Sequence, residues 1–414
     1  MAAEPRIPWG RFVERLRPAN PTGMSKADRT PLKYRAFVPD RIADTEFVFS
    51  GSLATTMGEA ERRIGALQGT APPAGLEQLA RQLLRAESVA SSRIEGLVMS
   101  HKRISLALFD PGVADATAVS IVGNIRAMEE AVRIGSAGRA IGVDDLVEMH
   151  RALLSSTRDK YLAGVVRQEQ NWIGASSLAR AKFIPPPAEE VAGLLGDLCR
   201  FVNRLDVPPI AQAAIAHSQY ETIHPHLDGN GRVGRCLIHV VLRRRGLTPR
   251  YVPPVSLVLA TEADRYVAGL GEYRRGDFES WCDLFTSAAG AAAEHAVELG
   301  EQMAQAQQRW LERLPTRPRR DSATARLLDI LPGHPVIDGA TVAKLLDVSD
   351  EAARIALNNL EAAGILKEST SRRWGRAYAA TEVFEMLDGF ENTLATPAAA
   401  EAAVRPAPTV RRLL

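Results

Sequence analysis

The 414-residue sequence has only three cysteines and no long uninterrupted apolar run. Cys199, Cys236 and Cys282 lie far apart and lack the short paired spacing of zinc or redox motifs, which excludes a disulfide framework and a cysteine metal site. We expect all three to be buried small apolar residues in a reducing compartment. The best candidate for a membrane span, residues 288–297, is short and is interrupted by a glutamate and a histidine, so no spanning helix is predicted.

The chain also lacks a dominant sign of charge. Lys and Arg number 51 and Asp and Glu 49, so no global field would steer the protein to nucleic acid or to an anionic membrane. Residues 1–15 contain no apolar core of signal-peptide length, and we therefore expect a cytoplasmic protein without membrane contact. The length predicts two or three domains, and 46% hydrophobic residues with 24% charged residues are typical of soluble globular proteins.

Helical patterns fill the middle of the chain. Apolar residues recur close to the helical period from Leu76 to Ile94, and Gly96 stands where a helix would stop, so we predict one helix ending near Glu95. Few intervening stretches alternate like strands, which predicts a mainly α fold with one loop-like insertion at residues 172–187. The other helices expected in this part of the chain are 118–134, 143–155, 188–202, 210–223, 230–245 and 278–313.

The two ends of the chain have different patterns. Residues 1–40 show little periodicity, and we expect an extended segment that lies on the surface of the later domains. After a Pro- and Arg-rich linker, helices at 340–346 and 350–363 precede two short strands, 365–368 and 377–380, around an Arg-rich turn. This order is typical of a winged helix-turn-helix. Repeated Ala and Pro after Thr393 predict a disordered tail.

The string His-Pro-His-Leu-Asp-Gly-Asn-Gly-Arg-Val-Gly-Arg at 224–235 combines several chemical functions. Its glycine-rich part leads into a helix, where free backbone N–H groups and the helix dipole form an anion site. Arg232 and Arg235, three residues apart, add two guanidinium groups suited to successive phosphates. Asp228 supplies a hard oxygen ligand for Mg²⁺, and His224 is placed to accept a proton from an attacking hydroxyl.

Two alternatives for these residues remain open at this point. A Gly-Asn-Gly turn with a structural histidine is a common feature of loops without a function. His224, His226 and Asp228 have the spacing of a hydrolase metal cluster, since two imidazoles two residues apart can bind zinc from a strand. A zinc site gives no reason for the glycines and the two arginines, and the sequence before His224 is helical, so the phosphate interpretation is favoured.

The string resembles the signature of the Fic family, His-Pro-Phe-x-Asp/Glu-Gly-Asn-Gly-Arg-x-x-Arg, and matches eight of its nine specified positions. The departure is His226, where the family usually has a Phe that anchors the loop in the helical core. Residues 34–39 resemble the start of the family's N-terminal region, and residues 167–187 resemble its flap, a small β-hairpin. A surface loop without a function is an equally open interpretation of that flap.

The resemblance implies Mg²⁺-dependent transfer of AMP from ATP to a Ser, Thr or Tyr hydroxyl of a target protein, which can be the protein itself. His224 would take the proton of that hydroxyl, and Asp228 would hold Mg²⁺ on the α- and β-phosphates. UMP, phosphocholine or phosphate as the transferred group stays open. The resemblance implies that Asn230 and the backbone of Gly229 and Gly231 cradle the α-phosphate, that Arg232 stabilises the leaving diphosphate and that Arg235 binds the γ-phosphate.

Residues 91–96, Ser-Ser-Arg-Ile-Glu-Gly, resemble the family's inhibitory helix motif, Ser/Thr-x-x-x-Glu-Gly/Asn. A carboxylate is disfavoured near a helix C-terminus, so Glu95 needs a partner. The resemblance implies that Glu95, on the helix that carries Ser91, pairs with Arg235 and prevents productive binding of the γ-phosphate. In some relatives the same glutamate supports removal of AMP from the target.

The C-terminal unit has two open interpretations. A winged helix commonly binds DNA, with Arg354, Asn358 and Asn359 on its second helix and Arg372, Arg373 and Arg376 in its wing as candidate contacts. A module for protein interaction or for a homodimer is the alternative. A DNA-binding regulator whose Fic domain senses nucleotide or modifies the protein itself is therefore the second functional hypothesis. The expected units are an N-terminal Fic-associated region at 1–115, a Fic catalytic domain at 116–315, a winged helix at 322–391 and a tail at 394–414.

Overall fold

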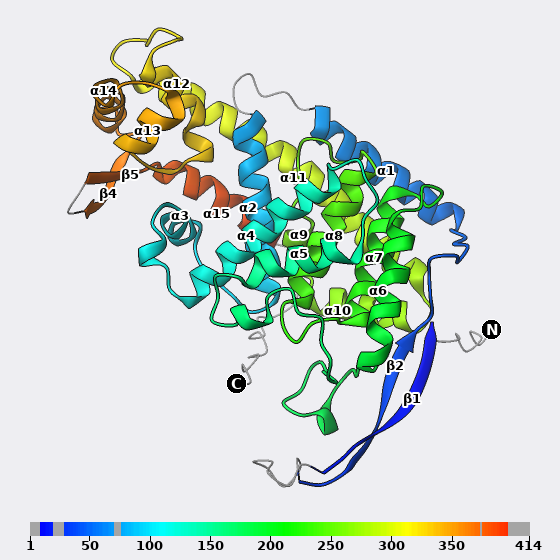
Figure 1. Cartoon of the computed structure of the whole chain (residues 1–414). Coiled ribbons are helices and arrows are strands. Elements are labelled where there is room, and N and C mark those ends of the chain that lie inside the picture. Colours follow the sequence, from blue (N-terminus) through cyan, green and yellow to red (C-terminus); the bar gives the residue numbers. More distant parts are fainter. Residues whose placement is uncertain (1–8, 20–28, 70–75, 373–374, 396–414) are drawn as a thin grey trace, which may run out of the picture.

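The computed structural model describes residues 9–19, 29–69, 76–372 and 375–395 of the chain. Helices make up most of this part, and two small antiparallel sheets lie at opposite ends of the molecule (Figure 1). The prediction of a mainly α fold is confirmed. None of the described helices combines the length and the apolar character needed to cross a membrane.

The helices predicted from apolar periodicity are present, and each end lies within two residues of the expected position. Helices without such a prediction complete the body and the C-terminal unit. The predicted helices of the body are α2 (Leu76–Ile94), α4 (Ala116–Gly135), α5 (Val143–Leu154), α6 (Ala188–Val202), α7 (Pro209–Ile223), α8 (Asn230–Arg244) and α11 (Phe278–Arg313), and those of the C-terminal unit are α13 (Gly339–Leu346) and α14 (Asp350–Ala362). The others are α1 (Gly51–Gly69), α3 (His101–Phe109), α9 (Val255–Thr261), α10 (Ala263–Arg274), α12 (Ala323–Ile330) and α15 (Thr381–Ala395).

Helix α7 lies at the centre of the body, and every residue from Ile210 to Ile223 is buried. It packs against α6, α8 and α11, so it has no solvent-facing side. Polar side chains on such a helix need internal partners. Gln212 donates to the main-chain oxygen of Phe201 at 2.8 Å, and Gln219 donates to that of Asp40 at 2.8 Å. The burial of α7 fixes the position of the loop that follows it.

The N-terminal segment forms a β-hairpin. Strands β1 (Gly10–Arg17) and β2 (Leu32–Pro39) pair antiparallel along their whole length, and the hairpin projects from the helical body (Figure 1). The segment is extended, as expected, but its strands pair with each other, which the sequence does not predict. The amide of Phe37 in β2 donates to the main-chain oxygen of Ile184 at 2.9 Å, so the hairpin also contacts the predicted flap.

The C-terminal unit comprises α12, β3 (Val336–Asp338), α13 (Gly339–Leu346), α14 (Asp350–Ala362), β4 (Lys367–Arg372) and β5 (Gly375–Ala379). Its strands form one antiparallel sheet in the order β3-β5-β4, and β3 is the strand that the sequence does not predict. Helix α15 then continues to Ala395 because its buried Leu387 and Phe390 pack against the core, so the predicted tail does not begin at 394. Residues 396–414 of that tail lie outside the described residues.

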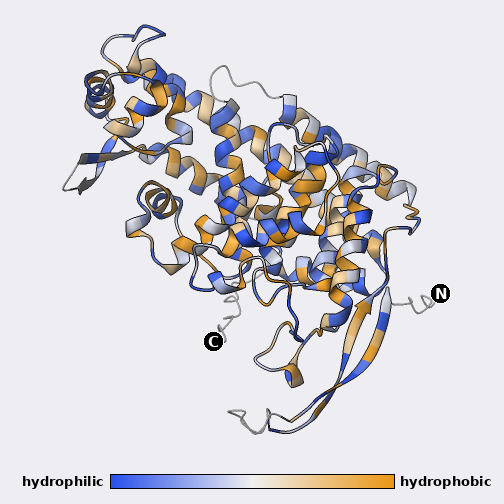
Figure 2. Ribbon diagram, in the orientation of Figure 1, coloured by the Kyte–Doolittle hydropathy of each residue, from blue (hydrophilic) through white to orange (hydrophobic). Residues whose placement is uncertain are grey.

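Helix α2 connects the body to the C-terminal unit. It packs against α4, α8 and α9 on one side and against the 3₁₀ turn Leu331–Gly333 on the other. Gln82 donates to the main-chain oxygen of Pro332 at 2.5 Å, and Arg85 to that of Gly333 at 3.2 Å. One hydrophobic cluster runs through both parts, and Figure 2 shows apolar residues along the packed helix faces in each. Helix α2 is therefore in direct contact with both parts of the molecule.

Candidate active site

The loop between α7 and α8 has two left-handed backbone positions. His224 has φ 50° and ψ 60° at the end of α7, and Gly229 has φ 82° immediately before α8. A positive φ is rare for a residue with a side chain and is a feature of functional sites. The loop between these two positions connects α7 to α8, which pack against each other.

Hydrogen bonds to the main chain hold the loop in shape. Asn230, the first residue of α8, accepts from the amide of His226 at 2.8 Å and donates to its carbonyl at 2.8 Å. Asn171 donates to the carbonyls of both His226 and His224, at 2.9 and 3.2 Å. Asn230 is 2% exposed, so its side chain shapes the anion site from within the loop.

His226 anchors the loop, at the position where the family signature has Phe. Its ring is 1% exposed and stacks on His150 at a centroid distance of 3.6 Å and an interplanar angle of 14°. Its Nδ1 donates to the main-chain oxygen of Val165 at 2.7 Å. His150 accepts from the amide of Gly164 and donates to the carbonyl of Asp228, each at 3.0 Å. Both rings are therefore neutral and act as an aromatic anchor.

We expect His226→Phe to fold and to resist acid better than the wild type. Burial lowers the pKa of His226 to about 3, whereas the unfolded chain takes up the proton near pH 6.5. Between these values the unfolded state binds more protons, so the wild-type free energy of unfolding falls as pH falls. Between pH 7 and pH 5 the wild type should lose about 2 kcal/mol relative to His226→Phe, measured by urea unfolding. Parallel pH curves for the two proteins would contradict this anchor role.

Arg167 joins the loop to the flap, and the sequence does not predict this role. The residue is 1% exposed, and its guanidinium donates to the carbonyl of His224 at 2.9 Å and to that of Pro186 at 2.6 Å. Its amide donates to Pro225 at 2.9 Å. The flap itself, residues 172–187, has a single antiparallel bridge, between Ile173 and Phe183, in place of the expected hairpin ladder. A short 3₁₀ turn occupies its tip.

The side chain of His224 is mostly buried, with 18% of it exposed. Burial, together with the nearby guanidinium groups of Arg274 and Arg167, lowers the pKa of His224 to about 3. The imidazole is therefore neutral throughout the physiological range, as a proton acceptor must be. The same burial makes His224 a weak base. A nearby negative charge would stabilise its protonated form and raise its basicity.

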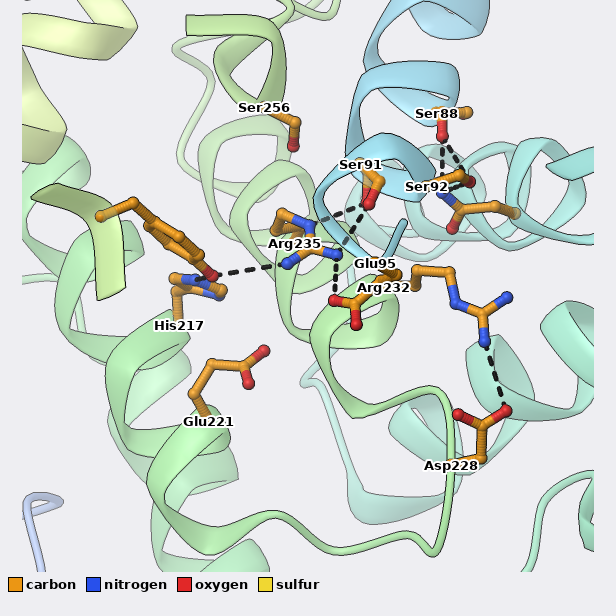
Figure 3. Close-up of polar contacts among 12 residues, drawn as sticks. Ser88, Ser91, Ser92, Glu95, His217, Glu221, Asp228, Arg232, Arg235 and Ser256 are labelled. Atoms are coloured by element: carbon orange, nitrogen blue, oxygen red, sulfur yellow. Dashed lines mark hydrogen bonds and ion pairs between the residues drawn. The ribbon is translucent and has the colours of Figure 1, made fainter. Parts of the chain in front are cut away.

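Asp228 and Arg232 form the outer part of the site. Arg232 donates to Ser120 Oγ at 2.8 Å and lies 3.4 Å from the carboxylate of Asp228, whose side chain is 53% exposed (Figure 3). One open carboxylate beside a phosphate site fits Mg²⁺, which takes one or two protein carboxylates together with phosphate oxygens. A zinc cluster does not fit: no group of three or more His, Cys, Asp or Glu side chains within the described ranges is placed to hold a metal ion. The His226 ring faces His150 instead.

Arg235 is bound by the predicted inhibitory segment. Its guanidinium is 1% exposed and donates to Ser91 Oγ at 2.8 Å, to the Ser91 carbonyl at 2.9 Å and to Glu95 Oε1 at 2.7 Å (Figure 3). It also lies 3.4 Å from the hydroxyl of Tyr266. The donors of Arg235 are thus occupied by protein groups, and the two arginines of α8 have different partners.

The carboxylate of Glu95 also reaches the start of α8. A Cβ on Gly231 would lie 2.0 Å from Glu95 Oε1, so only glycine leaves room for this contact. Desolvation raises the pKa of Glu95, but Arg235, by charge and by hydrogen bonding, and then Arg232 outweigh it and hold the pKa below its usual value. The carboxylate is ionised and lies at the anion site formed by the helix N-terminus.

Sequence comparisons identify relatives of this region. Residues 140–242 match the Fic/DOC family, and residues 54–133 match its N-terminal family. Protein adenylyltransferase fic-1 of Caenorhabditis elegans is 37% identical over 141 residues, 32% of this chain and 25% of that protein. Protein adenylyltransferase Fic of Drosophila melanogaster is 32% identical over 134 residues, 30% of this chain and 26% of that protein. The matches thus span about a quarter of the length of these relatives.

Solved structures share the fold. A Fic family protein from Desulfovibrio desulfuricans superimposes with a TM-score of 0.51 at 20% identity, over 81% of this chain and 97% of that one. A Fic domain containing signaling protein from Bacteroides thetaiotaomicron gives a TM-score of 0.50 at 18% identity, over 60% and 97% of the two chains. The two family matches and the signature loop show that residues 54–242 carry a Fic/DOC domain with its N-terminal part, and the solved structures add a likeness of fold.

Proposed function

We propose that the chain transfers AMP from ATP to a Ser, Thr or Tyr hydroxyl of a protein, itself included. The observation that carries the proposal is the loop at 224–235, where a neutral buried histidine lies beside a helix N-terminus and two guanidinium groups. The names of the nematode and fly relatives support the same activity. Labelled ATP incubated with the purified chain tests it directly, because the label must become covalently attached to protein.

The reaction needs one proton acceptor and no covalent enzyme intermediate. His224 takes the proton of the target hydroxyl while the hydroxyl oxygen forms a bond to the α-phosphorus of ATP. The bond from that phosphorus to the bridging oxygen breaks, and pyrophosphate leaves with the bonding electrons. Positioning and charge neutralisation supply most of the catalysis in such transfers. The backbone of Gly229 and Gly231 would hold the α-phosphate, and Arg232 would stabilise the leaving group.

Asp228 is the proposed metal ligand. When bound, Mg²⁺ would neutralise charge on the phosphates during the transfer. The pair between Arg232 and Asp228 is long, at 3.4 Å, and half-exposed, so the carboxylate can exchange this contact for another at small cost.

We further propose that the enzyme is autoinhibited in the conformation described. Arg235 cannot offer its Nε and Nη2 donors to a γ-phosphate while Ser91 and Glu95 occupy them. The carboxylate at Gly231 also repels an incoming phosphate, because both are anions. Release of Glu95 from Arg235 would therefore open the site.

The end of the inhibitory helix is held by the C-terminal helix. Arg93, two residues before Glu95, forms an ion pair with Glu391 of α15, and His101 of α3 lies 2.9 Å from the other oxygen of that carboxylate. Glu391 is only 7% exposed, so this contact is shielded from solvent. The C-terminal unit thereby restrains the segment that carries Glu95.

We expect Glu391→Gln to raise AMP transfer about two- to tenfold, because Arg93 is partly exposed and loss of its ion pair should weaken the hold on the end of α2 by about 0.4–1.4 kcal/mol. Initial rates with labelled ATP give the measurement. Glu77→Gln is the matched control, since Glu77 pairs with Arg81 on the exposed face of the same helix. Equal rates in the two variants would show that α15 does not restrain the inhibitory segment.

The DNA-binding alternative finds less support. Residues 322–391 contain seven Lys and Arg residues against eleven Asp and Glu residues, which is unfavourable for binding a polyanion. Arg354 pairs with Glu351 at 2.5 Å, and Asn359 donates to Thr324 at 3.1 Å, so two of the candidate contacts have internal partners. Arg373 lies outside the described residues. Salt-dependent retention of the full chain on random DNA would revive this alternative.

A further inference from the structure

Glu221 lies on α7, three residues before His224, and has no assigned role. Its side chain is 8% exposed, and Oε2 lies 4.0 Å from Nδ1 of His224. Within the described part of the chain, Oε1 has no hydrogen-bond partner, and neither has Nδ1 of His224. Figure 3 shows Glu221 projecting from α7 towards the space in front of Arg235 and Glu95. The carboxylate of Glu221 thus lies near an unpartnered ring nitrogen of His224, beside the signature loop, and one of its own oxygens also lacks a partner.

Titratable groups from four elements surround this carboxylate. Arg235 of α8 and Arg274 of α10 favour its ionised form, whereas Glu95 beyond the end of α2 opposes it. His224 follows it at the end of α7. Burial raises the pKa of Glu221 to about 7, with Arg235 and Arg274 lowering it and Glu95 raising it. The carboxyl group therefore changes charge near neutrality, and the change depends on whether Glu95 is present.

A carboxylate at this position would make His224 a stronger base. The imidazole becomes a cation when it accepts the proton of the target hydroxyl, and burial makes that cation costly. A carboxylate within reach of Nδ1 lowers this cost and fixes the tautomer in which Nδ1 carries the proton. The separation of 4.0 Å is too long for a hydrogen bond, but such contacts commonly tighten once substrate is bound.

We propose that Glu221 is a positioning residue whose carboxylate accepts a hydrogen bond from Nδ1–H of His224, which leaves Nε2 free to take the proton of the target hydroxyl, and whose negative charge balances that of the imidazolium. The proposal rests on the proposed function, because it assigns His224 the role of proton acceptor. The packing of Glu221 against Gly234, where an added Cβ would lie 2.4 Å from Oε1, keeps the carboxylate in α7's narrow contact with α8.

The test compares Glu95→Gly with Glu95→Gly/Glu221→Gln. We expect the second substitution to lower kcat about 10- to 100-fold while the KM for ATP changes less than threefold, because Glu221 acts through His224 and does not hold phosphate. Glu221→Asp, which keeps the charge, should recover part of the loss. Since the burial of Glu221 already favours a neutral group, the glutamine variant is expected to fold.

The pH profile separates this role from a purely structural one. With Glu221 present, kcat should fall as pH drops through the pKa of its carboxyl group, because only the ionised form supports His224. That acid limb should lie below pH 7 in the Glu95→Gly background, where the charge that raises the pKa of Glu221 is gone. The limb should vanish in the glutamine variant. Glu87→Gln is the matched control: Glu87 is also fully buried but bonds to Ser256 and His239, and its loss should leave the limb in place.

A second readout is independent of turnover. Nitrogen NMR of ¹⁵N-histidine-labelled protein, assigned with His224→Ala, should show a proton on Nδ1 of His224, and Glu221→Gln should shift that signal. Unchanged kcat and an unchanged acid limb in the glutamine variant, or a His224 signal that does not move, would overturn the proposal. Lack of AMP transfer by Glu95→Gly itself would instead count against the proposed function. The NMR result would still show whether Glu221 contacts Nδ1 of His224.

Discussion

Replacing Glu95 with glycine is expected to raise AMP transfer about ten- to hundredfold, measured as the initial rate of labelling with ATP. The substitution removes the charge-assisted hydrogen bond to Arg235 at 2.7 Å and clears the carboxylate from Gly231. A hydrogen bond between charged groups stabilises by about 1.5–3 kcal/mol, which corresponds to that range in the population of the open site. The backbone tolerates glycine at this point because α2 ends at Ile94 and Gly96 already has φ +79°.

The control for this prediction uses the partner residue. In a protein with Arg235→Ala, the further change Glu95→Gly should give a clearly smaller increase, because only the removal of the carboxylate from Gly231 then contributes. A double-mutant cycle over the two positions measures their coupling. Equal gains from Glu95→Gly with and without Arg235 would contradict inhibition through this pair.

Replacing His224 with alanine in the Glu95→Gly background is expected to lower kcat about 10²- to 10⁴-fold, the usual contribution of a positioned base. ATP affinity should change little, since the phosphate-binding groups lie on α8 and not on the histidine. Burst and steady-state kinetics, together with nucleotide binding by calorimetry, separate the two effects.

His226→Phe in the same background is the matched control. It changes a histidine two positions away whose ring packs on His150 and does not face the substrate side of the loop. We expect transfer within about fivefold of the parent, because the aromatic stack is kept while the hydrogen bond to Val165 is lost. If the two histidine variants lost activity equally, His224 would have no distinct chemical role.

The sequence predicts a large part of this molecule. Each long amphipathic helix of the body follows from its apolar spacing, and the pairing of Glu95 with Arg235 follows from the resemblance of two short motifs 140 residues apart. The roles of the signature residues remain predictions, but their positions agree with one anion site. Helix α1 also has buried residues at helical spacing, such as Leu53, Met57 and Ala60, and was predictable by the same reasoning.

Other parts depend on contacts that no local pattern reveals. Arg167, Asn171 and His150 hold the loop from segments far away in the chain, and an isolated Arg, Asn or His has no distinctive signal. Glu221 is similar, because its importance lies in burial and in what surrounds it. The pairing of β1 with β2 depends on register across a long connection, which their composition does not specify.

The central claim is that the loop at 224–235 transfers AMP from ATP to protein. Intact-mass spectrometry of Glu95→Gly, incubated with Mg²⁺ and an equal mixture of ATP, GTP, CTP and UTP, tests it most directly. The account predicts a mass increase of one AMP on the protein, absent from the same variant with His224→Ala. An increase equal to UMP or another group, no increase at all, or an AMP increase that survives His224→Ala would contradict it.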